Sequence, residues 1–165
     1  MKGALNIFYF GLAAAIAFVA AVEEEELTEM QKKVLGLSLQ EYHKKEHVIN
    51  AFKVSSIQSI TETVFSQGTF VHLQLLLEQT SCRKHQWQKK DCKILRRARR
   101  LNCVTCYKIE EESLEVVSSY MDCIPEQLLQ TDREEGRREK CNEVKQTRET
   151  GLGLPGIFSF SRSRH

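Results

Sequence analysis

All six cysteines of this 165-residue chain lie between residues 82 and 141, and the first 81 residues contain none. An even number of cysteines in a small exported chain is typical of a disulfide framework, here of three bonds. The framework restricts the second half strongly, whereas the first half must be held by packing alone. The six are Cys82, Cys92, Cys103, Cys106, Cys123 and Cys141.

The N-terminal segment has the pattern of a cleaved secretory signal. Met1 and Lys2 supply positive charge, residues 7–22 are nearly all apolar or alanine, and four glutamates follow. The apolar run is shorter than the roughly 20 residues that a membrane anchor needs. We therefore expect a signal peptide over residues 1–21, cleavage after Ala21, and a secreted, extracellular protein with disulfides.

The next segment predicts one amphipathic helix over about residues 29–44. Thr28 followed by Gln31 fits a capping box, in which each side chain satisfies a free backbone amide at the helix start. Lys44 lies where a helix end favours cations. The apolar positions recur at helical spacing on one broad face, at Leu27, Met30, Val34, Leu35 and Tyr42.

After this helix the apolar period changes to two, which indicates β-strands. Phe52 and Val54 alternate with polar residues, and Ile57 breaks the alternation, so a bulge or bend near Ser55 is expected. A turn at residues 66–68 leads to a second strand over residues 71–77, and further strands are predicted over 103–109 and 114–123. The sequence therefore predicts an α+β domain, with one helix packed on an antiparallel sheet of about four strands. From Ile124 onward the chain is polar and its glycines indicate a loose end.

Cys103 and Cys106 are three residues apart on a predicted strand. An odd separation places their side chains on opposite faces, so they are expected to have different partners rather than to bond to each other. A redox or zinc site at this Cys-x-x-Cys is disfavoured in a secreted chain with four other cysteines. Cys82 and Cys92 flank a short basic loop, and a bond between them would close it.

Several segments together resemble the chemerin family, whose members are relatives of cystatins and cathelicidins. They read ELTEMQKKVLGLSLQEYHK, QTSCRKHQWQKKDCK, CVTC, DCIPEQ and LPGIFSFS, and they cover about residues 26–161. The resemblance implies a cystatin-like domain over residues 22–150. It also implies the disulfides Cys82–Cys92, Cys103–Cys123 and Cys106–Cys141.

The resemblance also implies a secreted precursor that extracellular serine proteases trim at its C-terminus. The trimmed end would activate a chemerin-type G-protein-coupled receptor and so regulate inflammation, leukocyte chemotaxis and adipocyte differentiation. On this interpretation residues 151–161 are a flexible receptor-activating tail and residues 162–165 are a propeptide, with cleavage at Ser161, Arg162 and Arg164. The implied receptor-binding residues are Pro155, Gly156, Ile157, Phe158, Ser159, Phe160 and Ser161.

The chemistry of the tail fits such a switch. In an extended segment Phe158 and Phe160 project to the same side, so one receptor pocket can take both rings. Arg162 and Arg164 would displace the terminal carboxylate from Ser161 and would carry charge into a partly desolvated site. The alternative is that the phenylalanines pack back on the domain. The family pattern is not complete, because Leu154 stands where an aromatic residue is usual and Ile157 where a polar one is expected.

The densest run of positive charge lies between residues 83 and 100, with nine basic residues and one acid. Such a run fits heparan sulfate or an anionic membrane surface, and its alternative interpretation is a solvated hairpin loop. Arg97–Arg100 also resembles a furin-type site, but a cut there would leave two disulfide groups joined only by packing, which disfavours obligatory cleavage. The candidate heparin-binding residues are Lys89, Lys90, Arg96, Arg97, Arg99 and Arg100.

Other function classes are less well supported. A cystatin-like protease inhibitor would need a Gln-x-Val-x-Gly hairpin, which residues 64–68 (VFSQG) lack. A cathelicidin-like host-defence precursor would release a long cationic peptide, whereas the tail of this chain is short and mainly apolar. His43 and His47 have a metal-compatible spacing but no third ligand, so both are expected to be surface histidines. We therefore expect a monomer with no enzymatic activity, no cofactor, no metal and no nucleic-acid partner.

Overall fold

The computed structural model describes residues 26–148. The expected signal peptide and its cleavage after Ala21 lie outside the described residues, as does the expected tail. The elements follow in the order α1 (Glu29–Lys44), β1 (Asn50–Phe65), β2 (Gly68–Arg83), β3 (Arg100–Ile109), β4 (Val116–Pro125) and α2 (Thr131–Gln146). Neither helix within this range is long and apolar enough to cross a membrane.

Helix α1 has the predicted bounds and the predicted cap. The hydroxyl of Thr28 accepts the Gln31 amide at 3.1 Å, and the Gln31 side chain accepts the Thr28 amide at 3.1 Å. Val34 and Leu35 are buried on its inner face. The expected α+β class, with one N-terminal helix packed on a four-stranded antiparallel sheet, is confirmed.

The sheet has the order β1-β2-β3-β4, and every neighbouring pair is antiparallel. The predicted irregularity in β1 is present, because the β1–β2 register shifts between Val54 and Ser56 and keeps Ile57 in the core. Residues 66–67 form the turn between β1 and β2. Gly68 follows with φ +124°, and a Cβ there would collide with the Ile109 carbonyl, so only glycine fits this position.

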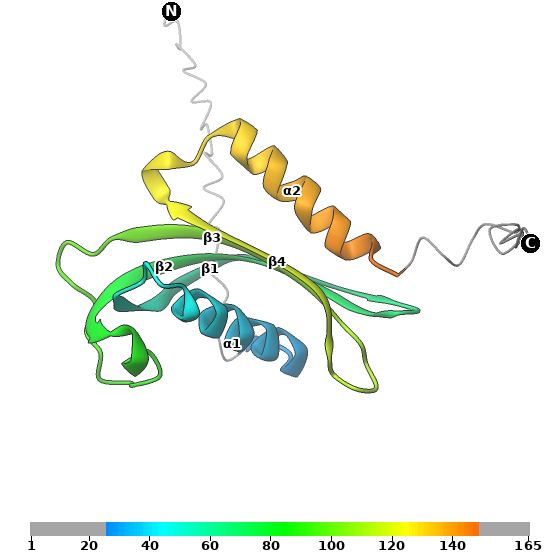
Figure 1. The fold of residues 1–165 in the computed structure, drawn as a ribbon, viewed down its shortest axis with the longest axis horizontal. Coiled ribbons are helices and arrows are strands. Elements are labelled where there is room, and N and C mark those ends of the chain that lie inside the picture. The colour runs from blue at the N-terminus through cyan, green and yellow to red at the C-terminus, as the bar shows by residue number, and fades with distance from the viewer. Residues whose placement is uncertain (1–25, 149–165) are drawn as a thin grey trace, which may run out of the picture.

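The two helices cover opposite faces of the sheet (Figure 1). The larger core lies between α1 and one face, and it includes Val71, Leu73, Leu75 and Leu77 of β2. A smaller cluster lies on the other face under α2, where it contains Phe70, Val104, Cys106, Cys141 and Val144. Strand β3 is therefore buried at every position after Arg100.

The three disulfides join the pairs that the family resemblance implies, Cys82–Cys92, Cys103–Cys123 and Cys106–Cys141. Cys103 belongs to the α1 side of the sheet and Cys106 to the α2 side, as their odd spacing predicts. The first bond closes the loop after β2, the second joins β3 to β4, and the third ties α2 to β3.

Helix α2 corrects the prediction for the C-terminal part of the chain. The segment after Ile124 was expected to be loose, but residues 131–146 form a helix, with Gly136 inside it. The apolar periodicity is weak because the buried positions of α2 are Arg137, Cys141 and Val144. An arginine and a half-cystine replace the apolar residues that such a pattern needs.

Candidate functional site

The predicted receptor-binding and cleavage residues Pro155–Ser161, Arg162 and Arg164 lie outside the described residues. The structure does describe the point from which this segment starts, at the end of α2. Lys108 of β3 is fully buried, and its ammonium donates hydrogen bonds to the carbonyl oxygens of Lys145 (3.1 Å) and Thr147 (2.8 Å). Its charge also faces the ring of Phe65 at 5.0 Å. A cation there complements the negative end of the helix dipole and fixes the helix terminus on the sheet.

The middle of α2 is held by a buried arginine. Arg137 is only 3% exposed, and its guanidinium donates to Asp122 Oδ2 at 2.7 Å, to Asn102 Oδ1 at 2.7 Å and to the Asn102 carbonyl at 3.0 Å. Arg133 makes two further bonds to Asp122. Partial burial by itself would raise the pKa of Asp122, but the hydrogen bonds and charges of the two arginines outweigh it and hold that pKa below its ordinary value.

Sequence reasoning missed the roles of Lys108 and Arg137. A usable signal existed for Lys108, because it is the one cation in the otherwise apolar or uncharged run of residues 101–109. A charge inside a strand that is covered on both faces must find partners, and the C-terminus of a helix supplies them. No comparable signal exists for Arg137, which lies among other charged residues of α2.

An open groove of about 1190 Å³ runs between α2 and the sheet. Strands β2 and β3 form its floor with Phe70, His72 and Val104, and β1 forms the far wall with Gln58 and Thr61. The side of α2 that faces the groove carries Glu134, Glu135, Arg138, Asn142 and Lys145. The groove therefore combines an apolar floor with a charged wall.

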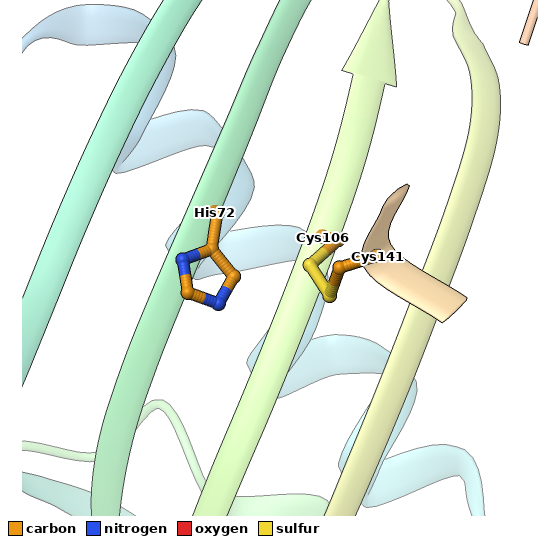
Figure 2. Close-up of side chains that lie close together, drawn as sticks. All are labelled: His72, Cys106 and Cys141. Atoms are coloured by element: carbon orange, nitrogen blue, oxygen red, sulfur yellow. A yellow bond between two sulfur atoms is a disulfide. The ribbon is translucent and has the colours of Figure 1, made fainter. Parts of the chain in front are cut away.

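His72 and Cys141 line this groove, and Cys106 lies beside them (Figure 2). Their nitrogen and sulfur atoms lie within 4.8 Å of one another, which is close enough for a shared metal ion. The two sulfurs are joined in a disulfide, however, and metal ligation needs thiolates. The side chain of His72 makes no hydrogen bond within residues 26–148, and partial burial lowers its pKa below the ordinary value. A neutral imidazole therefore lines the groove beside the disulfide.

His43 and His47, the pair with metal-compatible spacing, do not form a metal site. Both were expected to lie on the surface, and this expectation is wrong for His43. His43 is buried, and its Nδ1 donates to the Leu39 carbonyl at 2.7 Å while its Nε2 accepts the Phe52 amide at 3.0 Å. The ring also stacks on Trp87, with centroids 5.2 Å apart. Both nitrogens are therefore used to join α1 to β1, and His47 alone is exposed.

The candidate heparin-binding residues lie in the loop between β2 and β3, except Arg100, which is the first residue of β3, and this loop is at the end of the sheet away from the end of α2 (Figure 1). All six are exposed. The loop is fixed by the Cys82–Cys92 bond and by backbone bonds from Ser81 to Lys93 (2.9 Å) and from Leu95 to Gln79 (3.1 Å). It therefore presents its cations from a defined backbone.

Arg100 differs from the other five because acidic partners neutralise it. Its guanidinium lies 2.7 Å from Glu78 and 3.8 Å from Glu126. Arg96, Arg97 and Arg99 have no ion pair to described residues, and the same is true of Lys89 and Lys90, so these five candidate residues carry free positive charge. At the opposite end of the sheet the β3–β4 turn carries Glu110, Glu111, Glu112 and Glu115. The domain therefore has a basic end and an acidic end.

Two curated relatives establish the family. Retinoic acid receptor responder protein 2 of Bos taurus is 34% identical over 140 residues, which is 84% of this chain and 86% of the relative. The protein of the same name from Homo sapiens is 36% identical over 140 residues, 84% of this chain and 85% of the relative. The chain belongs to the retinoic acid receptor responder protein 2, or chemerin, family. No protein-family model matches it.

Among solved structures, Al-CPI is similar in fold to part of this chemerin-family chain. The likeness covers 59% of this chain and 91% of that chain, with a TM-score of 0.50 and 18% sequence identity. Dimeric human cystatin F is similar over 70% of this chain with a TM-score of 0.48 and 15% identity. At such identities a likeness concerns the fold alone. The α+β fold expected from the sequence, one N-terminal helix on a four-stranded antiparallel sheet, is the fold of this chain, with α2 added on the second face of the sheet.

Proposed function

We propose that this chemerin-family chain is the precursor of a secreted receptor ligand. Extracellular serine proteases remove residues 162–165, and the new end at Ser161 activates a chemerin-type G-protein-coupled receptor. The trimmed ligand attracts leukocytes and acts on adipocyte differentiation and metabolism. Family membership over 84% of the chain is the observation that carries this proposal.

The way in which α2 is fixed supports a ligand of this kind. The Cys106–Cys141 bond and the Lys108 hydrogen bonds hold the C-terminal half of α2 against β3. The segment that starts at Glu149 thus leaves the domain from a fixed point. Because this point lies at the end of the sheet away from the basic loop, a receptor can take the segment without contact with that loop (Figure 1).

The deciding experiment compares receptor activation by chains that end at Ser161 and at His165. The shorter chain is expected to be at least about tenfold more potent, since ~1.4 kcal/mol gives that factor and an unpaired buried arginine costs more. Cells that express the receptor report a dose curve for each chain, with protease inhibitors present throughout. Equal potencies would exclude the precursor model.

Two substitutions in the trimmed chain test which residues the receptor takes. Phe158→Ala and Phe160→Ala are each expected to weaken activation about tenfold or more, because each removes a ring worth about 1.5–3 kcal/mol of apolar burial. Neither change should lower the melting temperature of the domain. A large drop in melting temperature would instead mean that the rings belong to the structural core.

A second role is favoured by one observation. Arg96, Arg97 and Arg99 are exposed and unpaired among the described residues, on a loop that a disulfide closes. We infer that this loop binds heparan sulfate, whose sulfates pair with clustered guanidinium groups. Such binding would retain the secreted ligand near cell surfaces without use of its C-terminal end.

A further inference from the structure

The groove beside α2 has two different ends. Its near end lies where α2 finishes, because Lys145 faces the Phe70 ring at 5.9 Å and the described chain stops three residues later at Arg148. Its far end lies along the first half and middle of α2, where Glu134, Glu135 and Glu139 line the groove together with Arg138. Phe70, His72 and Val104 form the floor between these ends. The groove therefore changes from apolar to acidic with distance from the chain's exit point.

We propose that this groove binds the chain's own C-terminal segment, residues 149–165, in the untrimmed precursor. The proposal rests on the proposed function and adds how the precursor is kept inactive. With Phe158 and Phe160 on the floor of the groove, the rings are covered and the receptor has no access to them. Trimming then works by release of the segment as well as by exposure of a new carboxylate.

The length of the segment is sufficient for this contact. Helix α2 has 16 residues and a length of about 24 Å at 1.5 Å per residue. The chain from Arg148 to Arg162 spans up to ~46 Å when extended. It can therefore turn at the end of α2, run back beside the helix and still bring residue 162 to the far end of the groove.

The order of chemistry along the segment matches the order along the groove. Apolar residues come first and two arginines come last, while the groove has its apolar floor before its three glutamates. The exposed carboxylate of Glu135 has only a loose pair, 3.7 Å from Arg138. Arg162 and Arg164 find additional acidic partners there. The neutral ring of His72, which is only partly buried, offers an aromatic surface to Phe158 or Phe160.

A charge reversal tests the acidic end. In the chain that ends at His165, the triple change Glu134→Lys, Glu135→Lys and Glu139→Lys is expected to raise receptor potency at least about fivefold. A matched control is Glu46→Lys, Glu112→Lys and Glu115→Lys, which makes the same change of net charge at exposed positions away from the groove. The control should keep the low potency of the precursor. When Arg162→Glu and Arg164→Glu are added to the Glu134, Glu135 and Glu139 variant, the new glutamates can pair with the new lysines of α2. Receptor potency should then return to the low value of the precursor.

A measurement without receptor tests the contact itself. Phe160→Trp in the chain that ends at His165 is expected to show blue-shifted emission and weaker acrylamide quenching than the same change in the chain that ends at Ser161. Trp87 contributes equally to both. If trimming raises potency but the triple variant stays inactive and the spectra of the two Phe160→Trp chains agree, the groove contact is wrong and the precursor model stands. If both full and trimmed chains signal equally, the proposed function fails, and the fluorescence comparison alone decides whether the segment binds the groove.

Discussion

Three buried side chains carry or can carry a positive charge, namely His43, Lys108 and Arg137. Each makes hydrogen bonds to protein groups in place of the hydrogen bonds that water would supply. His43 joins α1 to β1, Lys108 binds the last carbonyls of α2, and Arg137 binds Asp122 and Asn102. A polar group without such partners would cost free energy in these positions. These residues therefore fix how the two helices sit on the sheet.

His43 is expected to make stability fall at mildly acidic pH. Burial is the main cause that lowers its pKa, the bond to the Leu39 carbonyl opposes this, and nearby Lys84 lowers it further. The unfolded chain thus binds a proton more readily, so the free energy of unfolding decreases as pH falls from about 6.5 through the folded-state pKa. Urea unfolding between pH 7 and pH 5 should show a shallower decrease for His43→Gln than for wild type.

The control for this prediction is His47→Gln, on the exposed side of the same turn. It should keep the wild-type pH dependence. His72, whose pKa burial also lowers, contributes a slope of the same sign in every variant. An unchanged slope in His43→Gln would contradict the prediction, because it would show that His43 does not cause the pH dependence.

Arg137 is expected to carry more stability than its exposed neighbours on α2. Arg137→Met leaves Asp122 and Asn102 without their main partner, and the loss of one member of a buried ion pair costs about 3 kcal/mol. Arg138→Met, at a side chain 79% exposed, should change the free energy of unfolding by less than about 0.5 kcal/mol. Chemical denaturation of both variants gives the comparison, and equal effects would remove the structural role of Arg137.

At the scale of elements, α2 is the part of the fold that depends most on specific bonds. Its buried residues are three, and one of them is a half-cystine. Helix α1 in contrast packs Val34, Leu35 and Tyr42 into the main apolar core. An amphipathic helix such as α1 is stabilised along its whole length, whereas α2 is attached at three points. Local opening is therefore expected to begin at α2.

The Cys106–Cys141 bond is expected to contribute about 3–4 kcal/mol, because it closes a loop with a sequence separation of 35. Cys106→Ala with Cys141→Ala should lower the free energy of unfolding by that amount and should speed hydrogen exchange in residues 131–146. Cys82→Ala with Cys92→Ala opens a loop with a separation of only 10 and should cost about 1 kcal/mol less. Unchanged exchange in α2 of the first variant would contradict the attachment by this bond.

At the scale of the whole molecule, charge is separated along the sheet. Nine basic residues gather between residues 83 and 100, and the β3–β4 turn at the other end carries four glutamates. The net charge of the entire sequence is only +2, so it conceals this separation. A polyanion is attracted to one end of the domain, while the C-terminal segment leaves from the other.

Heparin affinity should depend on the three unpaired arginines. Arg96→Ala, Arg97→Ala and Arg99→Ala together are expected to lower the salt concentration for elution from a heparin column, because exposed charges are screened by salt. Arg100→Ala should have a smaller effect, since Glu78 and Glu126 already neutralise that side chain. Arg138→Ala on α2 is the control for a general loss of charge. An elution position unchanged by the triple variant would leave the loop as a solvated turn.

Strong local patterns in the sequence were sufficient to predict several elements. The apolar period and the capping box gave the bounds of α1, the period of two gave the strands, and the odd spacing of Cys103 and Cys106 placed them on opposite faces. These patterns work because the backbone geometry of a helix or strand sets the repeat of its side chains. The family and the disulfide pairing came from longer motifs rather than from periodicity.

Only the tertiary structure, in contrast, shows that helix α2 covers the second face of the sheet. Helix α2 buries Arg137 and a half-cystine instead of an apolar stripe, so its hydrophobic pattern is too weak to predict. The partners that make Lys108 and Arg137 stable in the interior lie about 15 to 39 positions away along the chain. The groove likewise combines residues of β1, β2, β3 and α2. Such features depend on which elements pack against one another in the folded chain, and this packing cannot be predicted from local sequence patterns.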